Sequence, residues 1–335
     1  MITVAVNGFG RIGRNFVRAV LLDPQAVKNI TIAVINIGPA KPEFIAHMFR
    51  YDTLMGLFPG TIELKKNKLI INDHEIEIIS ELDPKAIHWD RYAIDWVVES
   101  SGAFSKQGKA RVHLESGAKH VLITAPSEGE DVSIIPGVNE SDYKPTDKIV
   151  SLGSCTTNAF IPTLKVLQDA FGIIQGFMTT IHAYTNTQVL LDVEDGDLRK
   201  SRAAALNIIP TSTGASKMLS KVLPELAGKI QAMAIRVPVA KVSLIDLTFT
   251  AKQLLTKEMI NASFIAASQS KAMNGIIGYT DLPLVSSDYS ADSRSVIIDG
   301  LLTEANESMG TVFGWYDNEW AYSMRLKDFL LYVNA

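Results

Sequence analysis

The chain has 335 residues, of which 47% are hydrophobic, and a formal net charge of −4. This length and apolar content are sufficient for two buried cores, and the weak charge with only short basic stretches argues against nucleic acid as a partner. One cysteine cannot form an internal disulfide, and no uncharged apolar run approaches the roughly 18 residues of a membrane span or resembles a secretory signal, so we expect a cytoplasmic protein without a membrane partner.

The first predicted element is a strand over residues 2–6, which leads through the turn NGFGRIGR into a helical stretch. In such a turn the first glycine permits a tight bend, the second lets the backbone approach a pyrophosphate, and the third lets the helix pack on the strand. The alternative is a simple strand-to-helix turn. We favour a dinucleotide site with the phosphates at the helix start, contacted by Gly8, Gly10, Arg11, Ile12 and Gly13.

Further buried strands are predicted in ITIAVIN (30–36), AIDWVVESSGAF (93–104) and HVLITAPS (120–127), alternating with helical segments. This order predicts a doubly wound parallel sheet, in which ligands bind beyond the carboxyl ends of the strands. Small polar residues at such ends are candidate cofactor contacts, although they are also common in plain turns. The candidates are Ser101, Gly102 and Thr124.

The second strand lacks the acid that normally holds the adenosine ribose at its end. The chain here reads Asn36-Ile37-Gly38, with Lys41 close by. Without a carboxylate nothing repels a 2′-phosphate, and a nearby lysine attracts one. We therefore expect Asn36 and Ile37 to border the ribose, and we favour NADP over NAD. The alternative is a solvated lysine beside a weaker NAD site.

The single cysteine, Cys155, lies in GSCTTN (153–158). A free cysteine is usually a small buried hydrophobe, but its neighbours are polar and the following AFIPTLKVL has helical spacing. Polar surroundings and a helix start both lower a thiol pKa, so a reactive thiolate is the competing interpretation. Among the histidines, only His182 ends a strand-like run amid hydroxyl residues, and sequence spacing alone does not bring it to Cys155.

Seven short motifs follow one another along the chain: NGFGRIGR, SCTTN, HAYTN, NIIPTSTGA, MAIRVP, PLVSSDYS and WYDNEWAYS. Their order is typical of the phosphorylating glyceraldehyde-3-phosphate dehydrogenases, which the chain resembles over nearly its whole length. Each motif alone is only modest evidence for the family. Seven in order are highly specific for this family and its close relative, erythrose-4-phosphate dehydrogenase.

The resemblance implies oxidation of D-glyceraldehyde 3-phosphate to 1,3-bisphosphoglycerate, a reaction of glycolysis and gluconeogenesis. By family position Cys155 is the nucleophile and His182 activates it. The thiolate attacks the aldehyde, the hemithioacetal passes a hydride to the nicotinamide, and inorganic phosphate cleaves the resulting thioester. No metal is expected.

Other site residues are assigned by family position. Thr185 and Arg236 would hold the substrate's phosphate, and Asn318 the nicotinamide carboxamide; judged alone, Arg236 would be a cation paired at a sheet surface. Lys200 stands where many bacterial relatives place an anion-binding arginine. The attacking phosphate would be bound by Ser154, Thr156, Thr213 and Gly214. Family members are homotetramers in which the loop around residues 187–202 lies between subunits, and we expect the same here.

Four departures from the family pattern bear on ligand choice. Ile37 replaces the aspartate of NAD-dependent members, and Leu82 replaces an arginine near the adenine. Glu194 replaces a proline associated with NAD use, yet its carboxylate would repel a 2′-phosphate if it faced the adenosine site. Thr187 replaces an acid near the substrate-phosphate pocket. The choice between NADP and NAD therefore stays open, with NADP slightly favoured.

The predicted fold is α/β, with a Rossmann-type doubly wound parallel sheet over residues 1–152 and a mixed α/β catalytic domain with a largely antiparallel sheet over residues 153–317. The C-terminal helix, residues 318–335, is expected to return to the first domain. Two other functions remain alternatives. One is erythrose-4-phosphate dehydrogenase, which hydrolyses its thioester, and the other is a catalytically decayed nucleotide-binding protein that interacts with protein or RNA.

Overall fold

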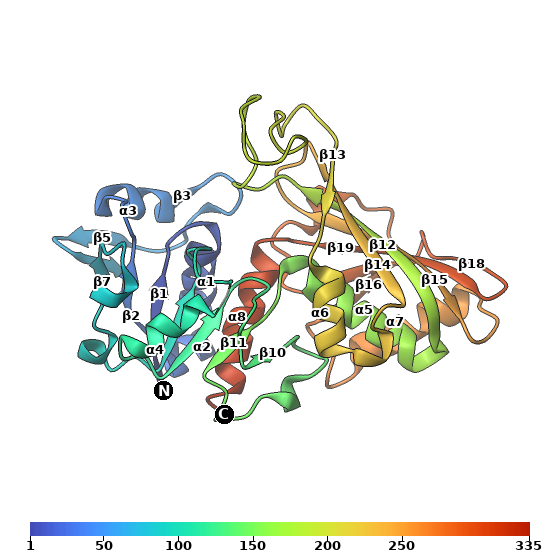
Figure 1. Cartoon of the computed structure of the whole chain (residues 1–335), viewed down its shortest axis with the longest axis horizontal. Helices are drawn as coiled ribbons and strands as arrows, with labels where there is room; N and C mark the ends of the chain where they lie inside the picture. The colour runs from blue at the N-terminus through green and yellow to red at the C-terminus, as the bar shows by residue number, and fades with distance from the viewer. Residues whose placement is uncertain (107) are drawn as a thin grey trace. The chain divides into compact units, whose positions relative to one another are not determined.

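The computed structural model describes residues 1–106 and 108–335, which divide into two compact units (Figure 1). The first unit comprises Met1–Ile134, Ser141–Gly153 and Ser323–Ala335. The second comprises Ile135–Glu140 and Ser154–Tyr322. Each unit is built on its own sheet.

The sheet of the first unit has the strand order β10, β11, β9, β8, β1, β2, β7, β6, β5 within the described part of the chain. The strands that pair in parallel are β1 (Ile2–Asn7), β2 (Ile30–Asn36), β7 (His74–Ile79), β8 (Trp96–Glu99), β9 (His120–Ile123), β10 (Val132–Ser133) and β11 (Ile149–Ser151). An antiparallel edge is formed by β5 (Ile62–Lys65) and β6 (Lys68–Ile71). The expected doubly wound parallel sheet is therefore confirmed.

The helices of the first unit are short. They are α1 (Arg11–Leu21), α2 (Pro24–Asn29), α3 (Pro42–Arg50) and α4 (Val112–Glu115), with 3₁₀ turns at Pro84–Ala86, Trp89–Tyr92 and Lys109–Arg111. A separate hairpin joins β3 (Tyr51–Asp52) to β4 (Gly56–Leu57). The last helix of the chain, α8 (Trp320–Tyr332), belongs to this unit from Ser323 onward. Its Phe329 packs edge-on against Trp96, and Lys327 Nζ lies 2.5 Å from Asp23 Oδ2.

Neighbouring parallel strands of the first unit end level with one another. Asn7, the last residue of β1, is paired with Asn36 on β2 and with Glu99 on β8, and Glu99 is paired with Ile123 on β9. Because strands of a doubly wound sheet are covered on both faces, they read in the sequence as apolar runs that stop at these polar residues. This register gathers the strand-end side chains at one edge of the sheet, the edge at which such folds bind ligands.

The second unit contains a mixed sheet of strand order β13, β14, β12, β15, β19, β17, β16 within the described residues, and β18 pairs with β19. Its strands are β12 (Ile173–Ala183), β13 (Ile209–Ser212), β14 (Ile230–Val237), β15 (Ser243–Ala251), β16 (Ile277–Thr280), β17 (Val296–Asp299), β18 (Glu304–Asn306) and β19 (Met309–Tyr316). The pairs β12–β14 and β16–β17 are parallel, and the others are antiparallel. The predicted mixed α/β unit is confirmed.

One face of this sheet is covered by α5 (Cys155–Phe171), α6 (Ala215–Val222) and α7 (Lys257–Gln269), which lie beside one another in Figure 1. Short 3₁₀ turns of this unit occur at Pro224–Leu226 and Ser286–Tyr289, and the turn Glu140–Asp142 lies at a boundary between the two units in the sequence. The core contains Phe160 and Leu164 of α5, Phe249 of β15 and Phe264 of α7, all fully buried. Alternate residues of β15 point into this core, as the period of two in its sequence predicts. The helix α5 is thereby fixed over the sheet with its amino end at residue 155.

In the described part of the chain, no helix is both long and apolar enough to cross a membrane.

Candidate active site

Cys155 is the first residue of α5. Ser154 caps the helix: its hydroxyl accepts a hydrogen bond from Thr157 N–H at 3.2 Å, and Thr157 Oγ1 accepts one from Ser154 N–H at 2.5 Å. Such a reciprocal cap fixes the first turn, where main-chain N–H groups and the helix dipole favour negative charge. The expectation that Cys155 lies at a helix start is confirmed, and the residue as a whole is half-buried.

His182 lies one residue before the end of β12 and is buried. Its Nε2 is 3.5 Å from Cys155 Sγ, so the fold joins the two side chains that the sequence could not connect. The parallel register of β12 and β14 places Arg236 directly beside His182. A thiol, an imidazole and a guanidinium thus meet at the amino end of α5.

Two groups compete for the other ring nitrogen of His182. Ala183 O lies 2.6 Å from His182 Nδ1, and Arg236 Nη1 lies 2.7 Å from the same atom. Arg236 Nη1 also donates to Ala183 O at 3.0 Å. A guanidinium can only donate, so contact with Arg236 favours the His182 tautomer with a lone pair on Nδ1 and a proton on Nε2. In the other tautomer Nδ1–H donates to Ala183 O, and Nε2 is free to accept a proton. The position of Arg236 therefore governs which His182 nitrogen faces the thiol as an acceptor.

The electrostatics differ from the expectation that the local sequence gave. Burial raises the pKa of the Cys155 thiol, and the charge of Arg236 and hydrogen bonds from Thr156 only partly oppose this. Burial, together with the charge of Arg236, lowers the pKa of His182 to about 3. Both shifts favour uncharged forms, because a charge that leaves water loses its hydration. Both shifts therefore favour a thiol beside a neutral imidazole, and Nε2 can accept the thiol proton only when the ring proton lies on Nδ1.

A tyrosine hydroxyl connects the elements that carry the pair. Tyr316, at the end of β19, is buried, and its hydroxyl lies 3.0 Å from Thr156 Oγ1 and 2.8 Å from Thr180 Oγ1. Thr156 follows Cys155 in α5, and Thr180 precedes His182 on β12 by two positions. The tyrosine ring also contacts His182 edge-on. Tyr316 therefore holds α5 and β12 at a fixed separation beside the reacting groups.

The turn after Tyr316 is fixed by a buried ion pair. Asp317 Oδ2 lies 3.1 Å from Lys241 Nζ, and Asp317 Oδ1 accepts hydrogen bonds from the backbone N–H groups of Glu319 and Trp320. Asn318 is buried, and its Oδ1 accepts a hydrogen bond from Ser243 Oγ at 3.3 Å. This hydrogen bond orients the carboxamide of Asn318.

The residues predicted to bind the two phosphate groups do not all lie beside Cys155 and His182. Thr185 lies just beyond β12, with its hydroxyl 2.9 Å from that of Thr187. Thr213 and Gly214 precede α6, but the register of β13 places Ile209 opposite Arg236, so they lie further along the sheet. The Thr156 hydroxyl contacts Tyr316 in the interior, and the Ser154 hydroxyl caps α5. Lys200 lies in the loop that joins β12 to β13 and lines a pocket with Thr187.

In the first unit, the glycine turn fits a dinucleotide phosphate. Gly8 has φ +91°, and a Cβ there would lie 2.5 Å from the Ser101 backbone; a Cβ on Gly13 would lie 2.3 Å from Gly8 O. Gly10 differs, because a Cβ there would meet no described atom within 4 Å. Gly10 is also the N-cap of α1, with no side-chain cap. The first and third glycines serve packing, and the second leaves the helix start open for an anion.

The other cofactor candidates border this turn or the strand ends. Arg11 Nη1 pairs with Asp52 Oδ2 at 2.5 Å, and Ile12 follows it in the first turn of α1. Thr124 Oγ1 donates to Glu99 O at 3.1 Å. Ser101 and Gly102 are exposed at the end of β8. Thr124 follows β9, Ser101 and Gly102 lie just beyond β8, and Arg11 and Ile12 begin α1; their contact with a cofactor stays a prediction.

At the second strand end, Asn36 is buried, and Ile37 is only 6% exposed, with its N–H bonded to Ile79 O. Ile37 therefore contributes an apolar wall and no hydrogen-bond acceptor from its side chain. Lys41 is exposed at the N-cap of α3.

The sequence reasoning missed Tyr316, Ser243 and the Lys241–Asp317 pair. A signal for Tyr316 existed, since alternate residues of β19 are buried and Tyr316 falls on the buried face. No comparable local signal identifies Lys241, because a lysine is normally exposed.

Two family models match the chain. One is described as "Glyceraldehyde 3-phosphate dehydrogenase, NAD binding domain" and covers residues 2–107; the other is the "C-terminal domain" of the same enzyme and covers residues 154–318. Glyceraldehyde-3-phosphate dehydrogenase 2 of Bacillus subtilis (strain 168) is 45% identical over 336 residues, which cover 100% of this chain and 97% of the relative. Glyceraldehyde-3-phosphate dehydrogenase of Geobacillus stearothermophilus is 43% identical over 334 residues, 99% of this chain and 98% of the relative.

Proposed function

The chain belongs to the glyceraldehyde-3-phosphate dehydrogenase family, and on this basis we propose that it oxidises glyceraldehyde 3-phosphate to 1,3-bisphosphoglycerate at Cys155. The observation that carries the proposal is the 3.5 Å contact between Cys155 Sγ and His182 Nε2, with Arg236 beside the ring. A nucleophile, a base and a cation in contact are the groups that acyl transfer on a phosphorylated aldehyde requires.

The first half of the reaction uses His182 as base and then as acid. Nε2 accepts the thiol proton as sulfur bonds to the aldehyde carbon, and it returns the proton to the carbonyl oxygen to give a hemithioacetal. Loss of the hydroxyl proton to His182 and of hydride from carbon gives the thioester. When bound, the dinucleotide accepts that hydride.

In the second half, an oxygen of inorganic phosphate attacks the thioester carbonyl. The carbon–sulfur bond breaks, the acyl phosphate leaves, and the sulfur recovers its proton from His182. Sulfur suits this step because a thiolate is a good leaving group. One cysteine serves both halves.

Arg236 is the proposed site for the substrate's own phosphate, with Thr185 beside it. Its support is geometric: Arg236 is half-buried, its charge faces no described carboxylate within ion-pair distance, and its Nη1 lies 2.7 Å from His182 Nδ1. A phosphate that draws the guanidinium away leaves Nδ1–H to donate to Ala183 O, which presents Nε2 as the acceptor for the thiol. Binding of the substrate phosphate would then convert Nε2 of His182 into the acceptor for the thiol proton.

For the cofactor, we propose Gly8, Gly10 and Gly13 with the start of α1 as the phosphate cradle and Ser101 and Thr124 as further contacts. The choice of NADP over NAD is supported by the buried apolar side chain of Ile37 and the exposed Lys41. Asn318 is proposed to hold the nicotinamide carboxamide, by its family position and the hydrogen bond from Ser243 that orients its side chain.

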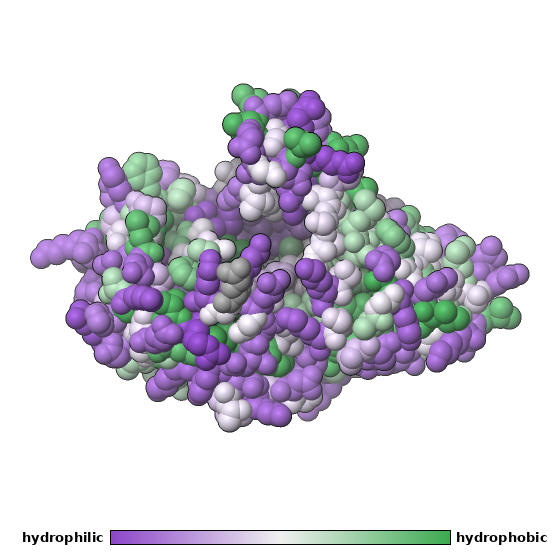
Figure 2. Space-filling view, in the orientation of Figure 1, coloured by the Kyte–Doolittle hydropathy of each residue, from purple (hydrophilic) through white to green (hydrophobic). Residues whose placement is uncertain are grey.

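The loop between β12 and β13 supports the proposal of a homotetramer. In the loop that rises near β13 in Figure 1, apolar side chains lie on the surface in Figure 2. Leu198 is 94% exposed, and the other large apolar side chains exposed on this loop are Leu190, Leu191, Val193, Leu206 and Ile208. Surfaces of this kind are normally covered in a stable protein.

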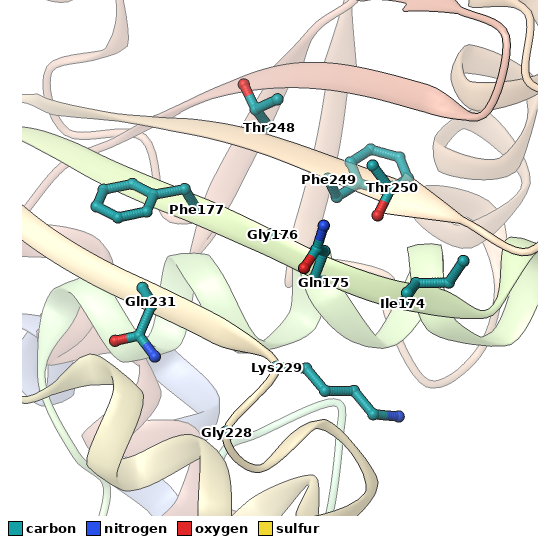
Figure 3. Close-up of a pocket in the computed structure, with 10 residues that line it drawn as sticks. All are labelled: Ile174, Gln175, Gly176, Phe177, Gly228, Lys229, Gln231, Thr248, Phe249 and Thr250. Atoms are coloured by element: carbon teal, nitrogen blue, oxygen red, sulfur yellow. The ribbon is translucent and has the colours of Figure 1, made fainter.

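A second surface lies on the sheet of the second unit. Ile174 and Phe177 of β12 are exposed and line a pocket with Gln231 of β14 and Thr248 of β15 (Figure 3). We propose that copies of this chain meet over both surfaces, and that the tetramer acts in the cytoplasm, where a single free cysteine stays reduced.

The test is the initial rate of reduced-cofactor formation from glyceraldehyde 3-phosphate, with NAD or NADP at matched concentrations and with or without phosphate. Phosphate-dependent rates that vanish in Cys155→Ser support the proposal. A rate that ignores phosphate and is higher on erythrose 4-phosphate indicates the hydrolysing relative. No rate with either cofactor, together with sluggish iodoacetate labelling of Cys155, indicates a binding protein.

A further inference from the structure

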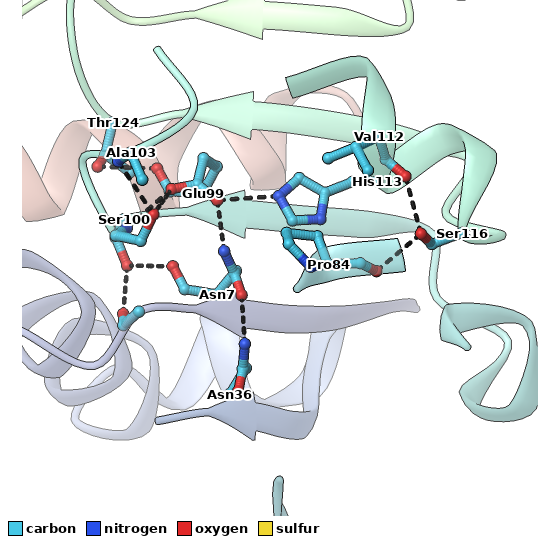
Figure 4. A network of polar contacts seen from close by, with 12 residues as sticks. Asn7, Asn36, Pro84, Glu99, Ser100, Ala103, Val112, His113, Ser116 and Thr124 are labelled. Atoms are coloured by element: carbon cyan, nitrogen blue, oxygen red, sulfur yellow. Dashed lines mark hydrogen bonds and ion pairs between the residues drawn. The ribbon is translucent and has the colours of Figure 1, made fainter. Parts of the chain in front are cut away.

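Glu99, the last residue of β8, carries a carboxylate that is 2% exposed and has no assigned role. Its Oε1 accepts hydrogen bonds from Ser101 N–H at 2.8 Å and from Ser101 Oγ at 2.5 Å. Its Oε2 accepts one from Asn7 Nδ2 at 2.6 Å and lies 2.9 Å from His113 Nε2 (Figure 4). A carboxylate has about four acceptor sites, and all are used here.

The protonation of His113 is defined by its second contact. Trp89 Nε1, which can only donate, lies 3.2 Å from His113 Nδ1. Nδ1 therefore carries the lone pair, and Nε2–H donates to Glu99. His113 is fully buried and, among the described residues, is the one basic group in ion-pair distance of Glu99.

The network continues from Glu99 to the next two strand ends. Asn7 Oδ1 accepts a hydrogen bond from Asn36 Nδ2 at 2.7 Å. Asn36 Oδ1 in turn accepts from the N–H of Gly38 at 3.3 Å and from that of Glu81 at 2.9 Å. One buried carboxylate is thus connected to the Ser101 turn on one side and to the Ile37–Gly38 turn on the other.

The turns held by this network border the proposed dinucleotide site. A Cβ on Gly8 would lie 2.5 Å from the Ser101 backbone, so the Ser101 turn is in direct contact with the glycine turn. The Ile37–Gly38 turn is the ribose end of the proposed site. A carboxylate is expensive to bury, and an apolar side chain would fill the core without that cost. Unlike an apolar side chain, a buried network in which every hydrogen bond is made fixes the orientation of each of its polar groups.

We infer that Glu99 is a positioning residue for the dinucleotide, which sets the Ser101 turn directly and the Ile37–Gly38 turn through Asn7 and Asn36. The inference rests on the proposed function, because the ligand at this edge is the proposed cofactor. Glu99 itself touches no ligand. Its replacement should weaken binding of the dinucleotide and leave the chemistry at Cys155 largely unchanged.

The first variant is Glu99→Gln, which keeps the size but turns one acceptor into a donor that faces another donor. Binding of NAD and of NADP is measured by titration calorimetry, and kcat and KM by initial rates. We expect dissociation constants and cofactor KM to rise about 10-fold or more, and kcat at saturating cofactor to stay within about 3-fold of the parent. Glu63→Gln, an exposed acid on β5 of the same sheet, is the matched control and should change neither.

A second pair of variants separates positioning from folding. His113→Phe removes the Nε2–H donor from a fully buried place behind the ligand edge, and should also weaken dinucleotide binding. His113→Gln, whose amide both donates and accepts, should restore most of it. This pair carries the test if Glu99→Gln does not fold.

Amide hydrogen exchange of the free protein gives a readout that needs no ligand. Exchange at Ser101–Gly102 and at Ile37–Gly38 should accelerate in Glu99→Gln and not in Glu63→Gln. Unchanged exchange, or unchanged dissociation constants in both Glu99→Gln and His113→Phe, overturns the inference. If the parent protein binds neither dinucleotide, the proposed function and the inference both fail; if the parent binds and the variants bind equally, only the inference fails.

Discussion

His182 Nε2 lies 3.5 Å from Cys155 Sγ, although the two residues are 27 positions apart in the sequence and come from a strand end and a helix start. This contact gives the Cys155 thiol a base. Burial raises the pKa of that thiol, so reactivity at neutral pH depends on proton transfer to the ring.

Loss of the base should slow the thiol strongly. We expect His182→Asn to reduce both kcat and the rate of iodoacetate labelling by about 100-fold or more, the usual contribution of a general base. Mass spectrometry of the labelled protein measures this directly, since Cys155 is the single cysteine. His88→Asn, an exposed histidine, is the control. Equal labelling rates in parent and His182→Asn would show that the contact is not used.

Tyr316→Phe removes the hydroxyl that joins Thr156 to Thr180. Two buried hydroxyls lose a partner, so the free energy of unfolding should fall by about 1–3 kcal/mol. Because α5 and β12 are then less firmly held, kcat should fall about 10-fold. Urea denaturation and initial rates measure the two effects, with Tyr332→Phe, an exposed tyrosine, as control. A loss of stability with unchanged kcat would limit Tyr316 to a structural role.

The glycine turn offers a matched pair of substitutions. Gly8→Ala forces a Cβ against the Ser101 backbone at a positive φ, so we expect loss of several kcal/mol of stability or failure to fold. In Gly10→Ala the new Cβ meets no described atom, so the free energy of unfolding should stay within about 1 kcal/mol of the parent value. Its dinucleotide affinity should nevertheless fall about 10-fold or more, as calorimetry would measure. Normal affinity in Gly10→Ala contradicts the assignment of the phosphate cradle.

Lys41 carries the preference for a 2′-phosphate in our proposal. Lys41→Ala should raise the KM for NADP about 5–10-fold, because a charge-assisted contact is lost, and leave the KM for NAD within about 2-fold. Initial rates with both cofactors test this, and Lys28→Ala, another exposed lysine of the first unit, is the control. If both KM values shift together, Lys41 does not select the cofactor.

Stability in acid should depend on the Asp23–Lys327 pair. Burial alone raises the pKa of Asp23, but hydrogen bonds from Lys327 and from the backbone of Ala26 and Gln25 outweigh it and keep this pKa below its ordinary value. A depressed folded pKa contributes stability that is present above the unfolded pKa of about 3.9 and is lost as the pH falls through the folded value.

Asp23→Asn should therefore lower the free energy of unfolding by about 1–2 kcal/mol at pH 7, and the difference from the parent should shrink below about pH 4. Urea denaturation at several pH values measures the two curves. The control is Asp73→Asn, an exposed acid of the same unit. Parallel curves down to about pH 2 would show that Lys327 does not stabilise the Asp23 carboxylate.

Local sequence was sufficient to predict the parallel sheet, whose level strand ends form the edge at which we propose that the dinucleotide binds. The glycine spacing, the apolar strands and the small residues after them all act over a few neighbouring positions, and the level strand ends follow from parallel pairing. The predicted helix start at Cys155 also rests on adjacent residues, the Ser154 cap and the helical spacing behind it.

What the sequence could not supply depends on distant packing. Arg236 lies beside His182 only because β12 pairs with β14, and the thiol pKa is raised because the fold buries Cys155, which local polarity does not reveal. Glu99 could be taken for an ordinary polar residue at a strand end. Its function in the network depends on His113 and Asn7, which reach it from other elements.

The parallel pairing of β12 with β14 has a consequence for the newly made chain. Parallel neighbours cannot be joined by a tight turn, so β14 and then β19 are synthesised well after β12. While the ribosome is still making these strands, Cys155 and His182 exist without Arg236 or Tyr316. Reactivity of Cys155 towards aldehydes should therefore arise late, after the long-range strand pairs have formed. In a truncated nascent chain that lacks β14 and β19, Cys155 should not react with aldehydes.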